Sequence, residues 1–376
     1  MKTIGIVINT SWHIYNFRAG LIKTLQEMGY KVVAIAPKDV YSQKLIDTEM
    51  DYHDIEMNNM GTNIVEDTKL TYSYYKVFKK IKPDLLLLYT IKPNIYGSIA
   101  AKMLNIPVIS SITGLGTVFL HDNLSSKVAK LLYKVTLKIP GKVFFENPHD
   151  KKVFLDQGFV KKEKVVLIPG AGINTNEFMP MAESSSDEET SPKFLFIARL
   201  VRDKGLIEYI DAIKLLRPKY PTIEFAILGP YYPANPTAIT EEEMDGWVEE
   251  GLVNYLGESD NVKSIISEYD CVVLPSYREG LSRVLLEAAS MEKPIVTTNV
   301  PGCKDVVEDG VNGFLCEKEN AHHLAEKIEQ IILLTNYDRI QMGKKGREKV
   351  VKEFDEPIVN DKYIAAIQEM LGQYIK

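Results

Sequence analysis

Short runs of apolar and β-branched residues recur along the whole 376-residue chain and alternate with stretches of helical period. The runs are apolar on both faces, which is typical of strands in a parallel sheet covered by helices. Strand–helix alternation on this scale predicts an α/β fold with doubly wound sheets. The predicted strands are Ile4–Asn9, Val32–Ala36, Leu85–Tyr89, Val108–Ser111, Val143–Phe145 and Val165–Ile168 in the first half, and Phe194–Ile197, Phe225–Leu228, Val253–Leu256, Cys271–Leu274 and Ile295–Thr297 in the second.

Residues 181–192 interrupt this alternation. The segment is rich in Ser, Glu and Asp and ends in a proline, which predicts a solvated linker. We therefore expect one Rossmann-like domain over residues 1–180, a second over residues 193–355, and a terminal helical segment over residues 356–376. Because a doubly wound sheet binds ligands beyond the carboxyl ends of its strands, we expect the site residues just after each predicted strand.

The composition predicts neither a disulfide framework nor a membrane span. The chain holds three cysteines and no CxxC pair, which favours a reduced, cytoplasmic protein. The N-terminal apolar run is short and lacks a small-residue cleavage site, so it predicts a strand and not a signal peptide. No apolar run approaches the roughly 18 residues that a membrane-spanning helix needs. Any membrane contact is therefore expected to be peripheral.

Basic residues are concentrated in the first half of the chain. Residues 1–180 hold 23 Lys and Arg against 16 Asp and Glu, and the remaining residues hold 22 against 35. Either the first half faces an anionic surface or substrate, or the asymmetry reflects chance and solubility.

Residues 124–139 predict an amphipathic helix. One face carries apolar side chains that we expect to pack on the sheet, namely Leu124, Val128, Leu131, Leu132, Val135 and Ile139. The other face carries a lysine stripe of Lys127, Lys130, Lys134 and Lys138. Such a stripe either is merely hydrated or touches an anionic membrane surface, at about 1 kcal/mol for each lysine.

Cations follow the first predicted strand of the second half. Arg199 and Lys204 lie between that strand and the next predicted helix. The free N–H groups and positive dipole end of a helix start suit an anion. A guanidinium can hold two phosphate oxygens, and a lysine adds a point charge. The segment predicts a phosphate site, and the alternative is a solvated charged turn.

Two carboxylates flank the start of a helix after the fourth predicted strand of the second half. Glu279 lies in the loop, Glu287 lies about two helical turns deeper, and Gly280 lets backbone approach a ligand closely. Carboxylates accept hydrogen bonds from hydroxyls, and amides at the helix start suit a diphosphate. One pocket could hold a sugar at Glu279 and a ribose at Glu287. Alternatively, Glu279 is a charge at a helix N-terminus and Glu287 is the buried partner of a nearby cation.

Together these motifs resemble the family-4 class of retaining glycosyltransferases, whose GT-B fold has two doubly wound Rossmann-like domains. The resemblance covers nearly the whole chain and includes residues 198–205, 279–287, 294–296, Gly302 and 306–315. It implies that Arg199 and Lys204 bind the donor diphosphate and stabilise the leaving group, and that Glu279 and Glu287 bind the sugar and ribose hydroxyls. The remaining residues assigned to the donor are Gly229, Leu256, Gly257, Gly280, Leu281 and Ser282.

The first half resembles a subgroup that acts on undecaprenyl-diphosphate-linked sugars, as do bacterial transferases that add N-acetylgalactosamine to lipid-linked diacetylbacillosamine. The matching segments are residues 12–18, 91–97 and 113–117. The resemblance assigns the acceptor to Asn16, Phe17, Arg18, Gly114 and Gly116.

Two departures from the family pattern concern acceptor activation. Residues 10–13 replace a paired-glycine loop, and Thr113 stands where many members carry a histidine. His13 either substitutes for that histidine or is a solvated loop residue, so Thr113 and His13 are both candidates for the catalytic role.

The resemblance implies transfer of a hexose or N-acetylhexosamine from a UDP-sugar to a lipid-diphosphate-linked saccharide, in the assembly of a bacterial surface glycan such as a capsule. It also implies that residues 356–376 cross back to the first domain. The chain has no Asp-x-Asp motif, which agrees with metal-independent catalysis. We expect no cofactor, no metal and no nucleic acid partner, and a location at the inner face of the plasma membrane. The alternatives are a nucleotide-sugar 2-epimerase of the same fold and an inactive nucleotide-sugar-binding subunit.

Overall fold

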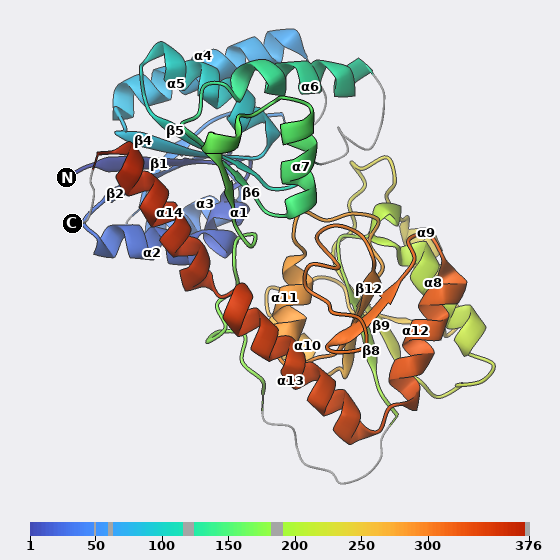
Figure 1. Cartoon of the computed structure of the whole chain (residues 1–376). Helices are drawn as coiled ribbons and strands as arrows, with labels where there is room; N and C mark the ends of the chain where they lie inside the picture. Colours follow the sequence, from blue (N-terminus) through green and yellow to red (C-terminus); the bar gives the residue numbers. More distant parts are fainter. Residues whose placement is uncertain (49, 59–62, 116–123, 182–190, 373–376) are drawn as a thin grey trace. The chain divides into compact units, whose positions relative to one another are not determined.

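A computed structural model describes residues 1–48, 50–58, 63–115, 124–181 and 191–372, and the chain forms two compact units (Figure 1). Unit 1 comprises Met1–Ala171 and Glu356–Lys376, and unit 2 comprises Gly172–Asp355. The first domain was predicted to end at residue 180. Unit 2 begins earlier because Ile173 and Phe178 are buried in its core, where Ile173 also bridges to Asp355.

Unit 1 is built on a parallel sheet with the strand order β3-β2-β1-β4-β5-β6-β7. Its central strand β4 is buried along its whole length, and successive side chains enter opposite cores. This alternation follows from the two-residue period of a strand. The strands are β1 (Thr3–Val7), β2 (Lys31–Ala36), β3 (Asp51–Asp54), β4 (Leu85–Tyr89), β5 (Val108–Ile112), β6 (Lys142–Phe145) and β7 (Val165–Leu167).

Helices cover both faces of this sheet. One core includes side chains from α1 (Ser11–Phe17), α2 (Ala19–Glu27), α3 (Val40–Asp47) and α14 (Glu356–Met370). The opposite core includes side chains from α4 (Ile64–Ile81), the π-helix η1 (Pro93–Gly97), α5 (Ser98–Met103), α6 (Leu124–Thr136) and α7 (Pro148–Asp156). A short 3-10 helix, η3 (Lys162–Lys164), precedes β7.

The helix α14 follows unit 2 in the chain but packs in unit 1. It lies beside α2 (Figure 1), and its Val359, Tyr363 and Ile367 are buried in the core of that sheet face. The hydroxyl of Tyr363 shares a 2.8 Å hydrogen bond with the Ser111 hydroxyl at the end of β5. Residues 356–370 are therefore an integral part of unit 1.

Unit 2 has a second parallel sheet, with the strand order β10-β9-β8-β11-β12-β13. Its strands are β8 (Phe194–Ile197), β9 (Phe225–Leu228), β10 (Asn254–Tyr255), β11 (Cys271–Leu274), β12 (Ile295–Thr298) and β13 (Gly313–Cys316). Its helices are η4 (Arg202–Lys204), α8 (Leu206–Leu216), α9 (Glu241–Glu249), α10 (Val262–Ser267), α11 (Arg283–Ser290), α12 (Ala321–Leu333) and α13 (Asn336–Glu353).

The prediction of an α/β fold with two doubly wound sheets is confirmed. Three local expectations were wrong. Strands β3 and β13 were not predicted, because these edge strands lack a continuous buried apolar run. Residues 11–17 form the helix α1 and not a loop, because the Thr10 hydroxyl accepts a hydrogen bond from the amide of His13 and caps the helix.

Candidate functional site

The ends of two neighbouring strands of unit 2 bring a lysine and a glutamate into contact. Lys204 ends η4, which follows β8, and Glu279 lies in the loop after β11. Because β8 and β11 are hydrogen-bonded neighbours, both residues lie at the carboxyl edge of the sheet. Lys204 Nζ forms an ion pair with Glu279 Oε1, and the side chains are only 19% and 14% exposed. The two residues assigned to donor phosphates and donor sugar are thus one charged pair.

Two glycines let the loops around this pair approach closely. Gly205 has a φ of +77°, and a Cβ there would lie 2.1 Å from the carbonyl oxygen of Pro275. Gly302 has a φ of +80°, and a Cβ there would lie 2.5 Å from the carbonyl oxygen of Glu279. The amide of Glu279 also donates to the carbonyl of Pro301 at 3.2 Å. The backbone of Glu279 is therefore held by the loop that follows β12.

The helix α11 begins directly after this loop. Ser282 is its N-cap and is nearly buried, but the Ser282 amide donates to the carbonyl of Gly302 at 3.0 Å. The protein itself therefore already uses that amide.

Glu287 lies in the second turn of α11 and is only 8% exposed. Its Oε1 accepts a hydrogen bond from Arg283 Nε at 2.9 Å. Burial raises the pKa of Glu287, and the neighbouring guanidinium of Arg283 opposes that shift. Two interpretations of Glu287 were open, a ribose-binding residue and the buried partner of a cation. The contact with Arg283 matches the second.

The remaining donor candidates lie at the ends of β8, β9 and β10. Gly229 packs so closely on β8 that a Cβ would lie 1.8 Å from the carbonyl oxygen of Ala198. The amide of Gly229 donates to the carbonyl of Gly257 at 2.7 Å, which joins two of the predicted residues. Leu256 is 38% exposed, and the guanidinium of Arg199 is exposed and lies 4.8 Å above the ring of Tyr232.

In unit 1, the residues that are candidates for binding or activating the acceptor lie after β1 and β5. His13 lies on α1, with Nδ1 3.1 Å from Asn9 Oδ1, and its ring is tilted against that of Phe17 with the centroids 5.4 Å apart. The Asn16 side chain donates to the carbonyl of Trp12 within the same helix. Thr113 and Gly114 follow β5, Thr113 is half-buried, and Gly114 has a φ of +121°. Gly116 lies outside the described residues.

Arg18 lies between α1 and α2 and is only 4% exposed. Its guanidinium stacks 4.3 Å above the ring of Tyr89, at the end of β4. It forms no hydrogen bond or ion pair with any residue that the structure describes. A buried guanidinium without such a partner is costly, which marks it as a candidate ligand-binding group.

Glu146, which directly follows β6 at the same sheet edge, was not predicted as a site residue. Burial raises the pKa of Glu146 to about 7, Arg18 opposes the shift, and Asp150 adds to it. A carboxylate immediately after a buried strand is the signal that could have revealed it.

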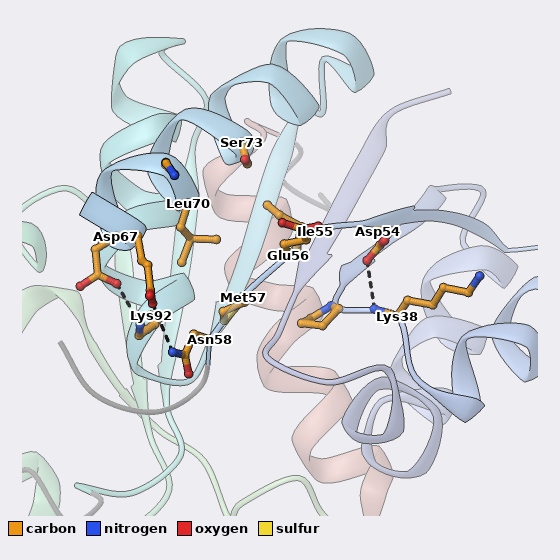
Figure 2. Close-up of a pocket in the computed structure, with 13 residues that line it drawn as sticks. Lys38, Asp54, Ile55, Glu56, Met57, Asn58, Asp67, Leu70, Ser73 and Lys92 are labelled. Atoms are coloured by element: carbon orange, nitrogen blue, oxygen red, sulfur yellow. Dashed lines mark hydrogen bonds and ion pairs between the residues drawn. The ribbon is translucent and has the colours of Figure 1, made fainter. Parts of the chain in front are cut away.

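A hollow of about 540 Å³ lies at the ends of β2 and β3 in unit 1 (Figure 2). Its wall includes Lys92, whose Nζ contacts Asp67 Oδ1 at 2.8 Å, and the hydroxyl of Tyr96 donates to Asp67 Oδ2 at 2.7 Å. No role was predicted for this wall, because the polar strand β3 was not predicted.

The helix α6 differs from expectation in the face that it buries. Ala129, Tyr133 and Leu137 face the core, whereas a row of Val128, Leu131 and Val135 is 40%, 62% and 58% exposed. The expected packing on the sheet was therefore wrong for these three residues, whereas Leu132 does pack against the core. The side chain of Leu124 lies outside those that the structure describes. Lys127, Lys134 and Lys138 are also exposed, while Lys130 is half-buried. The helices that the structure describes include none that could span a bilayer.

Comparison with known families decides the class of protein. Residues 181–349 match the family "Glycosyl transferases group 1", and residues 4–147 match the family "Glycosyl transferase 4-like". The protein is a glycosyltransferase. One relative, a protein of Campylobacter jejuni, is 28% identical to this chain, and the match covers 96% of this chain and 97% of the relative. That relative is named N,N'-diacetylbacillosaminyl-diphospho-undecaprenol alpha-1,3-N-acetylgalactosaminyltransferase.

Another relative of the glycosyltransferase is the UDP-Gal:alpha-D-GlcNAc-diphosphoundecaprenol alpha-1,3-galactosyltransferase of Escherichia coli. It is 26% identical and covers 78% of this chain and 77% of its own length. A sucrose-phosphate synthase from Thermosynechococcus elongatus has a similar structure, with a TM-score of 0.82 at 18% identity over the full length of both chains. An Anabaena protein in complex with UDP and glucose has a TM-score of 0.79 at 17% identity over 98% of this chain and 100% of its own. The glycosyltransferase therefore has the GT-B fold.

Proposed function

We propose that this glycosyltransferase moves a hexose or N-acetylhexosamine from a UDP-sugar to a lipid-diphosphate-linked saccharide, with retention of the anomeric configuration. The observation that carries the donor assignment is the Lys204–Glu279 pair at the carboxyl edge of the second sheet. Two relatives named for lipid-diphosphate-linked acceptors, one of them similar over nearly the whole chain, support the acceptor class.

The pair suits a donor that carries both a diphosphate and a sugar. Lys204 supplies a positive charge that stabilises the negative charge developing on the leaving diphosphate. Glu279 supplies oxygens that accept hydrogen bonds from sugar hydroxyls. Arg199 adds a second cation in the same segment after β8. In the same-face mechanism that the family resemblance implies, a phosphate oxygen of the leaving group takes the acceptor proton, so no metal is required.

The test is the release of UDP from a panel of UDP-sugars, with and without lipid-linked acceptors and with EDTA present. Lys204→Met should lower kcat by about 10²- to 10³-fold, the loss expected for one transition-state electrostatic contact. Arg202→Met is the matched control, because Arg202 lies on the same turn but is 44% exposed and paired with Glu243. Absence of UDP release with every donor, or equal effects of both substitutions, would reject the assignment. NMR of the product's anomeric proton decides between retention and inversion.

We also propose that α6 binds an anionic membrane surface, which would place the enzyme at the inner face of the plasma membrane. Exposed Val128, Leu131 and Val135 beside exposed lysines form an amphipathic surface of the interfacial kind. Co-sedimentation with vesicles of phosphatidylglycerol should exceed that with phosphatidylcholine vesicles. Leu131→Asp should abolish binding, whereas exposed Leu215→Asp on α8 should not. Equal sedimentation of the Leu131→Asp variant and the wild type would reject this surface.

A further inference from the structure

Four neighbouring strands of unit 1 end around a buried arginine. Tyr89 ends β4 and pairs with Ser111 of β5, and Ile112 pairs with Phe145 of β6. Glu146 is the first residue after β6. Arg18 is the first residue after α1, the helix that follows β1. The strand order β1-β4-β5-β6 therefore places Arg18 and Glu146 at one carboxyl edge.

A platform of aromatic rings fixes the guanidinium of Arg18. Tyr89 lies 4.3 Å beneath it, and Tyr363 of α14 packs on Tyr89 and on Phe144, with ring centroids 6.2 Å and 4.6 Å apart. The Tyr363 hydroxyl is bonded to Ser111. The rings orient the guanidinium by stacking and leave its N–H groups without a bonded acceptor among the described residues.

Arg18 and Glu146 influence each other electrostatically but form no ion pair, and the Glu146 carboxylate also lacks a hydrogen-bond partner in the described part of the chain. Arg18 is buried and Glu146 is half-buried, and a charge that is withdrawn from water without a hydrogen-bond partner is left unsatisfied. A ligand group that lies between them must accept a hydrogen bond from the guanidinium and donate a hydrogen bond to the carboxylate. A sugar hydroxyl does both.

The charges around the pair exclude the obvious alternative ligand, a phosphate. Glu146 acts on Arg18 together with Glu356 of α14, and Asp150 of α7 acts on Glu146. These carboxylates offset the single guanidinium, so the site is not a net cationic one that would favour a dianion. A neutral polyol fits this balance better.

We infer that Arg18 and Glu146 together bind a hydroxyl of the acceptor saccharide, with the guanidinium donating to the hydroxyl oxygen and the carboxylate accepting its hydrogen. This inference rests on the proposed function. It adds Glu146 to the acceptor site and assigns Arg18 to the sugar of the acceptor and not to its diphosphate.

The test compares steady-state kinetics of the wild type, Glu146→Gln and the surface control Glu163→Gln with a short-chain polyprenyl-diphosphate N-acetylhexosamine as acceptor. Glu163 lies in η3 with a side chain that is 69% exposed. Glu146→Gln should raise the acceptor KM about 10- to 100-fold, the range that a charge-assisted hydrogen bond supplies. It should leave the KM of the UDP-sugar unchanged. Because glutamine has the same shape, the thermal midpoint should not fall.

The outcomes separate this inference from the proposed function. No turnover by the wild type with any acceptor and donor pair overturns the proposed function. Turnover by the wild type with an unchanged acceptor KM in Glu146→Gln overturns the inference alone. A lower acceptor KM in that variant also overturns it, because it would mean that Glu146 repels a diphosphate bound at Arg18. Arg18→Met should show the same acceptor defect, with donor binding by calorimetry retained.

Discussion

Replacement of Gly302 by alanine tests whether close backbone contact positions Glu279. The substitution forces a non-glycine residue to a φ of +80°, which costs about 1–2 kcal/mol. The new Cβ would also lie 2.5 Å from the carbonyl oxygen of Glu279 and 2.7 Å from its Cβ. Relief of this overlap adds about 1–3 kcal/mol, as in an overpacked core. We therefore expect Gly302→Ala to lower the free energy of unfolding by about 2–5 kcal/mol.

The overlap also predicts an effect on turnover. The loop that carries Glu279 must move by about half an ångström to restore an ordinary contact, and a misplacement of this order lowers a rate by about 10- to 100-fold. Urea unfolding and UDP release measure the two effects.

Gly251→Ala is the matched control, because Gly251 has a φ of +66° but a Cβ there would meet no atom within 4 Å. It should lose about 1–2 kcal/mol and keep wild-type turnover. If Gly302→Ala loses no more stability than Gly251→Ala and keeps full turnover, the contact does not position Glu279.

Three further predictions concern stability and reactivity. Tyr363→Phe removes the hydrogen bond to Ser111 and should cost about 1 kcal/mol in urea unfolding, with the far-ultraviolet spectrum unchanged. All three cysteines are buried, and burial raises the pKa of the Cys303 and Cys316 thiols to about 12, so the native protein should resist iodoacetamide at pH 8 until urea is added. Burial raises the pKa of Glu146 to about 7, so the folded state keeps a proton that the unfolded state has released as the pH rises above 5. Between pH 5 and pH 8, stability should therefore fall by about 2–3 kcal/mol more in the wild type than in Glu146→Gln. Equal pH profiles of the two proteins would contradict the last expectation.

The strands that the sequence predicted best are those buried on both faces. Leu85–Tyr89, Phe194–Ile197, Phe225–Leu228 and Cys271–Leu274 have the predicted bounds, because each consists almost wholly of apolar residues in the middle of a sheet. The edge strand Asp51–Asp54 has no such run and could not be recognised. Its pairing depends on β2, which only the folded sheet supplies.

The candidate site was predictable where strand ends carry recognisable motifs. Lys204 and Glu279 are far apart in sequence, yet the rule that ligands bind at carboxyl strand ends led to both, and the structure brings them into contact. Their roles in binding remain predictions. Glu146 was missed because one carboxylate after a strand forms no pattern, and its character comes from burial and from Arg18, which lies far away in the sequence. Likewise, the face that α6 exposes depends on where the helix lies on the sheet.

Unit 1 is discontinuous, because α14 is synthesised after the whole of unit 2. On the ribosome, unit 2 can therefore fold to completion while unit 1 still lacks Val359, Tyr363 and Ile367 of its core. Until α14 emerges, the apolar face that it covers stays open to water and to other chains. Completion of unit 1 therefore waits until α14 has been synthesised and has docked. A chain that stops before residue 356 should form a folded unit 2 joined to an aggregation-prone unit 1.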